Sequence, residues 1–256
     1  EGFEVDYLDI NSDGIVSLKE LQSKLRKDTV LVSVMHINNE IGSIQPISAI
    51  ASHLKKHSRA IFHVDAVQSF GKYPVDFDSL GADVLSLSGH KINGLKGTGI
   101  VAWKPEITFL PVLVGGGQEY GLRSGTVAVP QAVSLAKAMR LTYENLAHAN
   151  QQYTKWSLEL RTYLRAFSSI KIISPNDGAA HILSFSVRNI KGEVLINALQ
   201  TRGIIISTSS ACSSRQVKTS HVIEALKISD DYKKGVLRVS FGYGMEDQQI
   251  QDFKYQ

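Results

Sequence analysis

The sequence predicts an α/β fold in which a mostly parallel, doubly wound sheet is followed by a smaller C-terminal α+β unit. Residues 29–37, 60–64 and 84–87 are apolar runs of the kind found in buried strands. Amphipathic helical patterns at 18–26 and 47–57 stand directly before the first two of these runs. Because strands that alternate with helices are joined by crossovers, we expect neighbouring strands to run parallel.

The second half of the chain predicts a separate, smaller unit. Residues 130–167 are rich in Ala, Leu, Gln and Glu and contain no internal proline, so we expect one or two long helices that bridge two domains. Residues 182–187 and 236–241 have strand patterns, and residues 193–200 have a helical pattern. The predicted domains are part of a large domain, residues 1–143, and a small C-terminal domain, residues 144–256.

Composition indicates a globular protein and argues against membrane or nucleic-acid partners. The 256 residues are 43% hydrophobic, which is enough for a substantial core. The net charge is only +4, and no dense basic block occurs. No apolar run approaches the roughly 20 residues of a membrane span, and the first residues carry no basic leader. A single cysteine cannot form an intramolecular disulfide, so we expect a reducing, cytoplasmic environment.

Residues 9–20 match the calcium-loop pattern D-x-[DN]-x-[DN]-G-x5-E. An EF-hand needs a helix before this loop, whereas residues 3–10 alternate as in a short strand. We therefore expect a strand–turn–helix connection here, with Asp13 and Gly14 at the turn.

Two other patterns are also weak indications of a site. His53 and His57 have the i, i+4 spacing of metal ligands, but adjacent lysines oppose a cation, so we expect a solvated helix face. The glycine run 115–117 lacks the G-x-G-x-x-G spacing and the strand–turn–helix context of a dinucleotide loop. We expect no metal site in this chain.

Asp65 directly follows the apolar run 60–64, where open α/β sheets gather ligand-binding residues. One interpretation is local, with the carboxylate capping the segment that follows. The other is chemical, because a carboxylate beside a pyridine nitrogen keeps that nitrogen protonated and makes the ring an electron sink. Gln68, three residues later, would then reach the phenolic oxygen of a pyridoxal cofactor.

An amine and small polar groups follow the next strand-like run. Ser88, His90 and Lys91 stand there, and Gly89 predicts a close approach of the backbone to a ligand. A lysine in such a loop is usually only solvated. Together with Asp65, Lys91 becomes a candidate Schiff-base lysine, since partial desolvation makes an amine nucleophilic. Ser88 and His90 are then candidate phosphate donors.

The only cysteine and a lone strand arginine complete the set. Cys212 lies in a run of small, mostly hydroxylated residues at 207–214. Free cysteine is often a core residue, but this run predicts a surface loop from which a thiolate enters an active site and carries an atom out. Arg238, inside the strand pattern 236–241, is either a structural ion-pair residue or a bidentate clamp for an amino-acid carboxylate.

Seven short motifs occur in order along nearly the whole chain. They are M-H-I-N-N-E-I-G at 35–42, H-V-D-A-V-Q-S at 63–69, S-L-S-G-H-K at 86–91, G-G-G-Q-E at 115–119, R-S-G-T at 123–126, S-A-C-S at 210–213 and L-R-V-S-F-G at 237–242. With them the chain resembles the cysteine desulfurases of the NifS/IscS type, in the class V aminotransferase branch of pyridoxal phosphate enzymes. The resemblance implies a type I pyridoxal phosphate transferase fold with an incomplete large domain.

The resemblance also implies roles for individual residues. Lys91 bonds the cofactor and acts as general base, and Cys212 carries the persulfide. Arg238, with Asn39, binds the substrate carboxylate. The implied cofactor-binding residues are Asn39, Asp65, Gln68, Ser88, His90, Lys91 and Thr126. Of these, Asp65 faces the pyridine nitrogen, Gln68 and Asn39 lie on the phenolic oxygen side, and Ser88 and His90 bind the phosphate.

The chain also differs from the family in two ways. Tyr120 stands where many relatives have an arginine. Family members begin well upstream of Glu1, so we expect about the first third of the enzyme, and a last helix after Phe253, to lie outside this sequence. The upstream part would hold a glycine- and threonine-containing phosphate-binding turn and a histidine that stacks on the pyridine ring. Thr126 resembles the residue that reaches the neighbouring subunit's phosphate, which implies a homodimer.

The expected activity is conversion of L-cysteine to L-alanine with transfer of sulfur to Cys212. From there the sulfur would pass to an acceptor such as an iron–sulfur scaffold protein, for iron–sulfur cluster, thio-cofactor or tRNA synthesis. One alternative is a selenocysteine lyase-like β-elimination, against which the Cys212 loop argues. Another, for this piece of chain, is an inactive module that dimerises or docks an acceptor.

Overall fold

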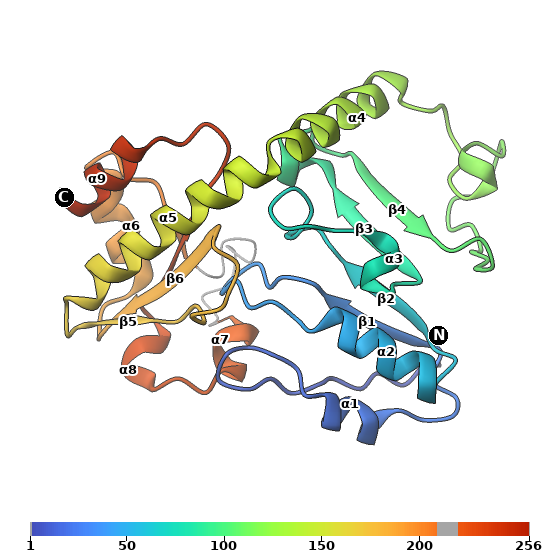
Figure 1. The fold of residues 1–256 in the computed structure, drawn as a ribbon, viewed down its shortest axis with the longest axis horizontal. Coiled ribbons are helices and arrows are strands. Elements are labelled where there is room, and N and C mark those ends of the chain that lie inside the picture. Colours follow the sequence, from blue (N-terminus) through green and yellow to red (C-terminus); the bar gives the residue numbers. More distant parts are fainter. Residues whose placement is uncertain (1, 209–219, 256) are drawn as a thin grey trace.

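The computed structural model describes residues 2–208 and 220–255. Its strands form two four-stranded sheets with the orders β1-β2-β3-β4 and β5-β6-β8-β7 (Figure 1). Two long helices, α4 and α5, run from the first sheet to the second. The fold is therefore α/β with a mostly parallel first sheet, as the sequence predicted, although the boundary at 143/144 stays a prediction.

The first sheet contains three parallel strands and one antiparallel edge strand. Its strands are β1 (Leu31–Met35), β2 (Ile61–Asp65), β3 (Val84–Ser88) and β4 (Gly99–Trp103). β1 pairs with β2 and β2 with β3 in parallel, whereas β4 pairs with β3 in the opposite direction. The three parallel strands correspond to the three apolar runs of the sequence.

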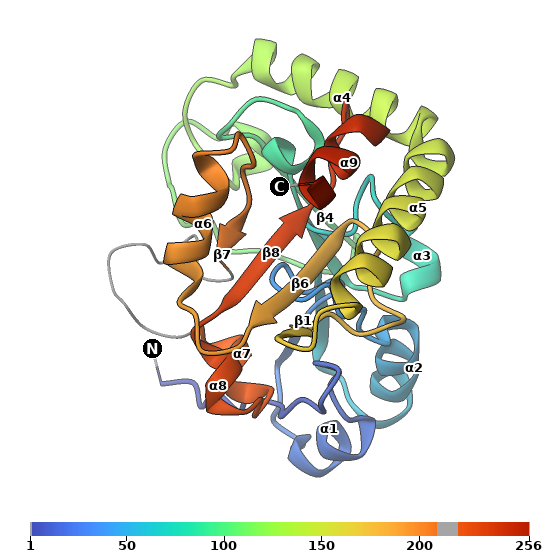
Figure 2. The same ribbon diagram turned by 90° about the vertical axis from the view of Figure 1, so that its left-hand side faces the viewer.

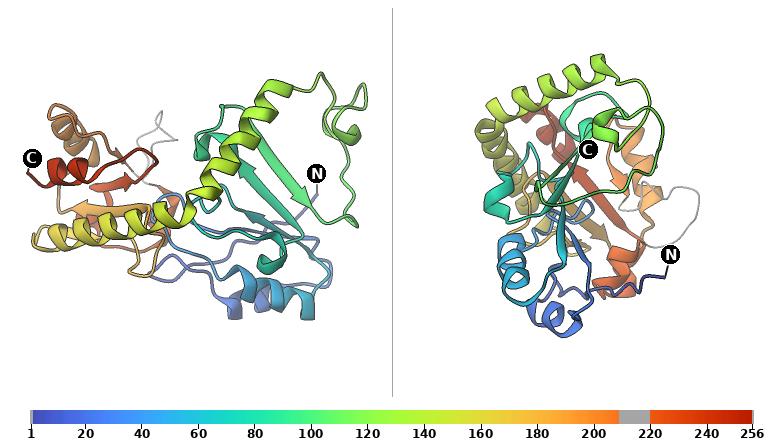
Figure 3. Two further views of the ribbon diagram at one scale, coloured as in Figure 1. Left: turned by 45° about the horizontal axis from the view of Figure 1, so that its top comes forward. Right: turned by 90° about the vertical axis from the view of Figure 1, so that its right-hand side faces the viewer.

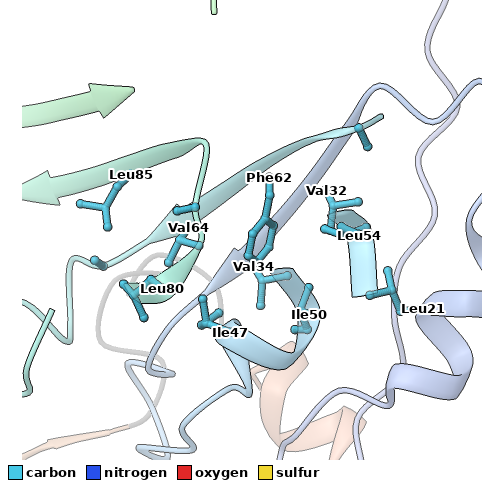
Figure 4. Packing of buried hydrophobic residues seen from close by; sticks show 13 residues of the cluster. Leu21, Val32, Val34, Ile47, Ile50, Leu54, Phe62, Val64, Leu80 and Leu85 are labelled. Atoms are coloured by element: carbon cyan, nitrogen blue, oxygen red, sulfur yellow. The ribbon is translucent and has the colours of Figure 1, made fainter. Parts of the chain in front are cut away.

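Helices cover one face of this sheet. They are α1 (Leu18–Lys24), α2 (Ile47–His57) and α3 (Phe77–Leu80). Val34, Phe62 and Val64 point toward them and pack on Ile47 and Ile50 of α2 (Figure 4). On the opposite face Leu31, Met35 and Ile61 are exposed, because successive side chains of a strand point to opposite sides.

The second sheet is antiparallel and packs on α5. Its strands are β5 (Ile170–Ile172), β6 (Ile182–Val187), β7 (Ser207–Thr208) and β8 (Val236–Ser240). α4 (Val129–Glu144) and α5 (Leu146–Arg165) meet at Asn145. Trp156 and Leu160 of α5 pack in one core with Leu183 and Leu237 of the sheet, and Figure 2 shows α5 beside β6.

Short helices complete the chain. They are η1 (Gly89–Ile92), η2 (Glu119–Gly121), α6 (Gly192–Gln200), α7 (His221–Ala225), α8 (Asp230–Lys233) and α9 (Asp247–Tyr255). The segment between β4 and α4 extends away from the rest of the chain (Figures 1 and 3). No helix in the described ranges is both long and apolar enough to cross a membrane.

The strand expected at residues 3–10 is wrong. These residues form no strand, and only Ile10 makes an isolated bridge, with Val16. The alternating apolar side chains Phe3, Val5 and Tyr7 are between 69% and 81% exposed, so no partner strand or core receives them. Residue alternation without a surface to bury it does not form a strand.

The calcium-pattern loop is a turn closed by its own side chains. Asn11 Oδ1 accepts hydrogen bonds from the amides of Asp13 and Ile15, both at 2.9 Å. Glu20, at the position of the last calcium ligand, instead accepts from the Asp9 amide and pairs with Lys24. The turn that the sequence predicted at Asp13 is present, without the preceding strand.

Replacement of Phe62 by alanine tests the first core. Phe62 is 1% exposed, so we expect Phe62→Ala to lower the free energy of unfolding by about 3–5 kcal/mol. The control is Ile61→Ala, on the exposed face of the same strand, with an expected loss of about 1 kcal/mol or less. Urea unfolding measures both, and equal losses would contradict this packing.

Candidate active site

Three candidate site segments follow the carboxyl ends of adjacent parallel strands. Asp65 is the last residue of β2 and Ser88 the last of β3, while Asn39 lies four residues after β1. The register aligns Met35 with Asp65 and Asp65 with Ser86, so the three ends lie at one edge of the sheet. This edge is where open α/β sheets bind ligands.

Asp65 has the local role of the two that the sequence left open, and its role toward a cofactor stays a prediction. Its Oδ1 accepts a hydrogen bond from the Val67 amide at 2.9 Å, so the carboxylate does shape the following turn. Its Oδ2 has no hydrogen-bond donor among the described residues, which leaves one oxygen for a ligand. Gln68 is half-buried in the same turn.

A row of hydrogen-bonded side chains crosses the three strands beside Asp65. His63 Nδ1 lies 2.8 Å from Ser33 Oγ, and His63 Nε2 lies 3.0 Å from Ser86 Oγ. Burial lowers the pKa of His63, and the charge of Asp65 partly opposes this. The two serines hold the imidazole two residues before Asp65, on the same face of β2.

Lys91 lies in η1, immediately after β3, with its side chain exposed. The two candidate phosphate donors contact each other, with Ser88 Oγ 2.7 Å from His90 Nδ1. A Cβ on Gly89 would lie 2.1 Å from Thr98 Oγ1 and 3.0 Å from Leu135 Cδ1, so the packing of these two side chains already requires glycine here. The approach of the Gly89 backbone to a ligand stays a prediction.

A second amine near Lys91 escaped the sequence reasoning. Burial lowers the pKa of Lys72, and the charge of Lys91 lowers it further. The Lys72 ammonium lies 6.0 Å from the centre of the Tyr153 ring, and no carboxylate pairs with it within the described chain. Nothing in the sequence around Lys72 distinguished it from a solvated lysine.

Arg238 reaches the first sheet from the second. It lies on β8, and its Nη1 donates to the backbone oxygen of Asn39 at 2.8 Å. Arg238 Nε is buried and has no acceptor in the described part of the chain. The structure thus brings together Asn39 and Arg238, the two residues to which the resemblance gave substrate binding, although they are 199 positions apart.

Thr126 and Tyr120, which the sequence analysis also singled out, lie in the segment between β4 and α4. In this extended segment (Figure 3) Thr126 is exposed, as is Tyr120, which is 97% exposed. The expectation that Cys212 lies on a surface loop falls outside the described residues.

His181, just before β6, also escaped the sequence reasoning. It is 4% exposed, and its Nε2 has no partner among the residues described. Burial lowers its pKa to about 3, the charge of Lys72 adds to this, and an interaction with the Gln68 backbone partly opposes it. His181 therefore sits neutral between the two sheets.

Comparison with known proteins identifies the family. The model of the family Aminotransferase class-V matches residues 1–253. The chain belongs to the class-V aminotransferases. It is 40% identical over 253 residues to "Cysteine desulfurase IscS" of Proteus mirabilis, a match that covers 98% of this chain and 62% of that relative. "Cysteine desulfurase IscS" of Mannheimia succiniciproducens is 41% identical over 256 residues, with 98% and 62% covered.

Solved structures of this family have the same fold. A "NifS-like protein" superposes with a TM-score of 0.92 at 36% identity, covering 99% of this chain and 67% of the other. The NifS-like protein from Rickettsia africae gives a TM-score of 0.88 at 26% identity, covering 97% and 67%. The fold is therefore the type I pyridoxal phosphate transferase fold. The chain spans about 62% of the length of the curated relatives it matches.

The neutral His181 predicts a loss of stability in acid. An unfolded histidine binds a proton below its ordinary pKa of 6.5, whereas folded His181 does so only near 3. Stability is thus fully present above pH 6.5 and falls as the pH drops toward 3, by about 2 kcal/mol at pH 5. Urea unfolding at pH 7.5 and pH 5 should show a smaller acid loss for His181→Gln than for wild type.

His148→Gln is the matched control, because His148 is exposed on α5. It should keep the wild-type acid loss. Burial also lowers the pKa of His36 and His63, so part of the loss remains in His181→Gln. An acid loss unchanged by His181→Gln would contradict the assignment.

Proposed function

We propose that the whole protein is a pyridoxal phosphate-dependent cysteine desulfurase that converts L-cysteine to L-alanine and loads the sulfur onto Cys212. The observation that carries the proposal is the meeting of Asn39, at the carboxyl edge of the parallel strands, with Arg238 from the second sheet, at 2.8 Å. Asp65 ends β2 and Lys91 follows the neighbouring strand β3 at that same edge. Relatives named cysteine desulfurase, about 40% identical, support the same reaction.

The residues present fit the cofactor. Asp65 has one carboxylate oxygen without a donor, as a protonated pyridine nitrogen requires, and Lys91 offers an exposed amine to an aldehyde. Ser88 and His90 offer hydrogen-bond donors for a phosphate. When bound, the cofactor supplies an electron sink for the bonds at the substrate Cα. Gln68 and Asn39 are the candidates for its phenolic oxygen.

The chain's own residues then bind the substrate and move a proton. The guanidinium of Arg238 binds the carboxylate of L-cysteine, because its planar fork matches two oxygens. Asn39 adds a hydrogen-bonding amide beside it. The Lys91 amine takes the proton from the substrate Cα and returns one to carbon later.

The sulfur step balances with Cys212 alone as acceptor. L-cysteine and the Cys212 thiol give L-alanine and a Cys212 persulfide. The substrate C–S bond breaks, an S–S bond forms, and a proton ends on the methyl carbon of alanine. Sulfur is oxidised to the persulfide level while the carbon is reduced, so no external oxidant or reductant is required. The Cys212 thiolate is the attacking form.

The proposed partners are a second copy of the chain and a sulfur acceptor. The exposed position of Thr126 in an extended segment suits donation to the cofactor phosphate of a neighbouring subunit. The acceptor is a protein such as an iron–sulfur scaffold, which takes the outer sulfur atom from Cys212. We propose a cytoplasmic location, supported by the single cysteine, although one relative from Candida albicans is named as mitochondrial.

Titration with pyridoxal phosphate tests the cofactor site. The wild-type chain should form a yellow species whose visible absorbance saturates, and Lys91→Ala should lose it completely because the bonding amine is gone. Lys96→Ala, an exposed lysine five residues away, should behave like wild type. Equal absorbance in all three proteins would overturn the role of Lys91, and no absorbance in any would support the interaction-module alternative.

Replacement of Cys212 by serine tests the sulfur carrier. Cys212→Ser should form no persulfide, because serine lacks the accepting thiol, yet should keep the yellow species seen in the titration. Mass spectrometry after incubation with L-cysteine detects the additional sulfur atom. Sulfur transfer to an acceptor by Cys212→Ser would sink the assignment.

A further inference from the structure

The turn after β1 is closed by its own atoms. Asn38 Oδ1 accepts hydrogen bonds from the amides of Glu40 at 2.9 Å and Ile41 at 3.0 Å. The Gly42 amide donates to the Asn38 oxygen at 3.0 Å, with a positive φ of 74° at Gly42 that favours glycine. This closed turn presents Asn39 and Glu40 to the second sheet.

Backbone oxygens of this turn accept hydrogen bonds from the second half of the chain. Arg238 Nη1 of β8 donates to the Asn39 oxygen, and Ser184 Oγ of β6 donates to the Glu40 oxygen. The Ala179 amide donates to the Gly42 oxygen at 2.7 Å. The turn is thus held against both central strands of the second sheet.

The side chain of Glu40 adds a connection to α7. Its Oε1 accepts from Ser220 Oγ at 2.8 Å, and the two residues are 6% and 8% exposed. Ser220 is the N-cap of α7, where its Oγ also accepts from the Val222 amide. Breaking this bond leaves the buried Glu40 oxygen without a donor and the Ser220 hydroxyl proton without an acceptor, so the connection is costly to lose.

The acceptor oxygen of Glu40 matters more here than its charge. Burial raises the pKa of Glu40, and the Ser220 hydrogen bond and the charges of His221 and Arg238 only partly oppose this. Its Oε2 has no partner in the described ranges. The surroundings therefore accept an uncharged side chain, and a glutamine supplies an oxygen of the same reach.

We propose that Glu40 is a positioning residue for recognition of the substrate carboxylate. By joining the turn that carries Asn39 to α7 and the second sheet, it holds the Asn39 and Arg238 groups at the separation that an amino-acid carboxylate needs. The proposal rests on the proposed function, and it gives Glu40 no contact with the substrate. Glu40 is therefore expected to affect the binding of an amino acid and not the binding of an amine that lacks the carboxylate.

The test compares two ligands that differ only in the carboxylate. L-alanine and ethylamine are titrated into the protein loaded with pyridoxal phosphate, and binding is followed by the cofactor absorbance. We expect Glu40→Ala to weaken L-alanine about tenfold and to leave ethylamine within about twofold of wild type, because only L-alanine uses Arg238. Glu40→Gln, which keeps the acceptor oxygen, should restore L-alanine binding to within about threefold.

Two further variants complete the design. Ser220→Ala removes the donor of the same hydrogen bond, so it should weaken L-alanine selectively even if Glu40→Ala does not fold. Arg238→Ala is the benchmark for a selective loss of the carboxylate ligand. If it shows no such selectivity, the proposed function fails and the role of Glu40 fails with it. With a normal benchmark, equal weakening of both ligands by Glu40→Ala and Ser220→Ala, or no weakening, overturns the role of Glu40 alone.

Discussion

Parallel pairing of β1, β2 and β3 is the constraint on which the rest of the structure depends. Because these strands run in one direction and in register, the segments that follow them begin at the same edge of the sheet. Asn39 and Lys91 belong to the segments after β1 and β3, and Asp65 is the last residue of β2. The core beneath the sheet, centred on Phe62, therefore also sets the separation of the chemical groups, because it determines where each strand ends.

The second sheet meets the first at these same strand ends. Arg238 contacts the turn after β1, while Asn150 of α5 donates to the backbone oxygen of Lys72, in the turn after β2, at 3.0 Å. His181 lies neutral between the turn after β2 and the second sheet. The segments that carry chemistry are thus also the ones that join the two halves, so a substitution there changes both positioning and stability.

Periodicity predicted the buried elements well and the exposed or short ones poorly. As expected, α2 lies between β1 and β2 along the chain, and β3 follows. β6 and β8 lie within a residue of their predicted ranges. The strand expected at 3–10 is absent, and its alternating apolar side chains Phe3, Val5 and Tyr7 are exposed. β7 has only two residues, too few to show a period. The sequence correctly predicted that Asp65 and Ser88 lie at strand ends, but it did not predict the packing of Gly89 against Thr98.

By itself, the sequence determined the order of the main elements and the types of group at the site, because hydrophobic period and short motifs are local properties of the chain. Only the tertiary structure decided which of those groups meet. Arg238 is hydrogen-bonded to Asn39, 199 positions away in the sequence, and Ser220 is hydrogen-bonded to Glu40, 180 positions away. Whether a polar side chain such as Glu40, Lys72 or His181 is buried, and whether it is then paired, depends on partners supplied by distant segments. Local sequence patterns do not predict this pairing, because the partners come together only when the chain folds.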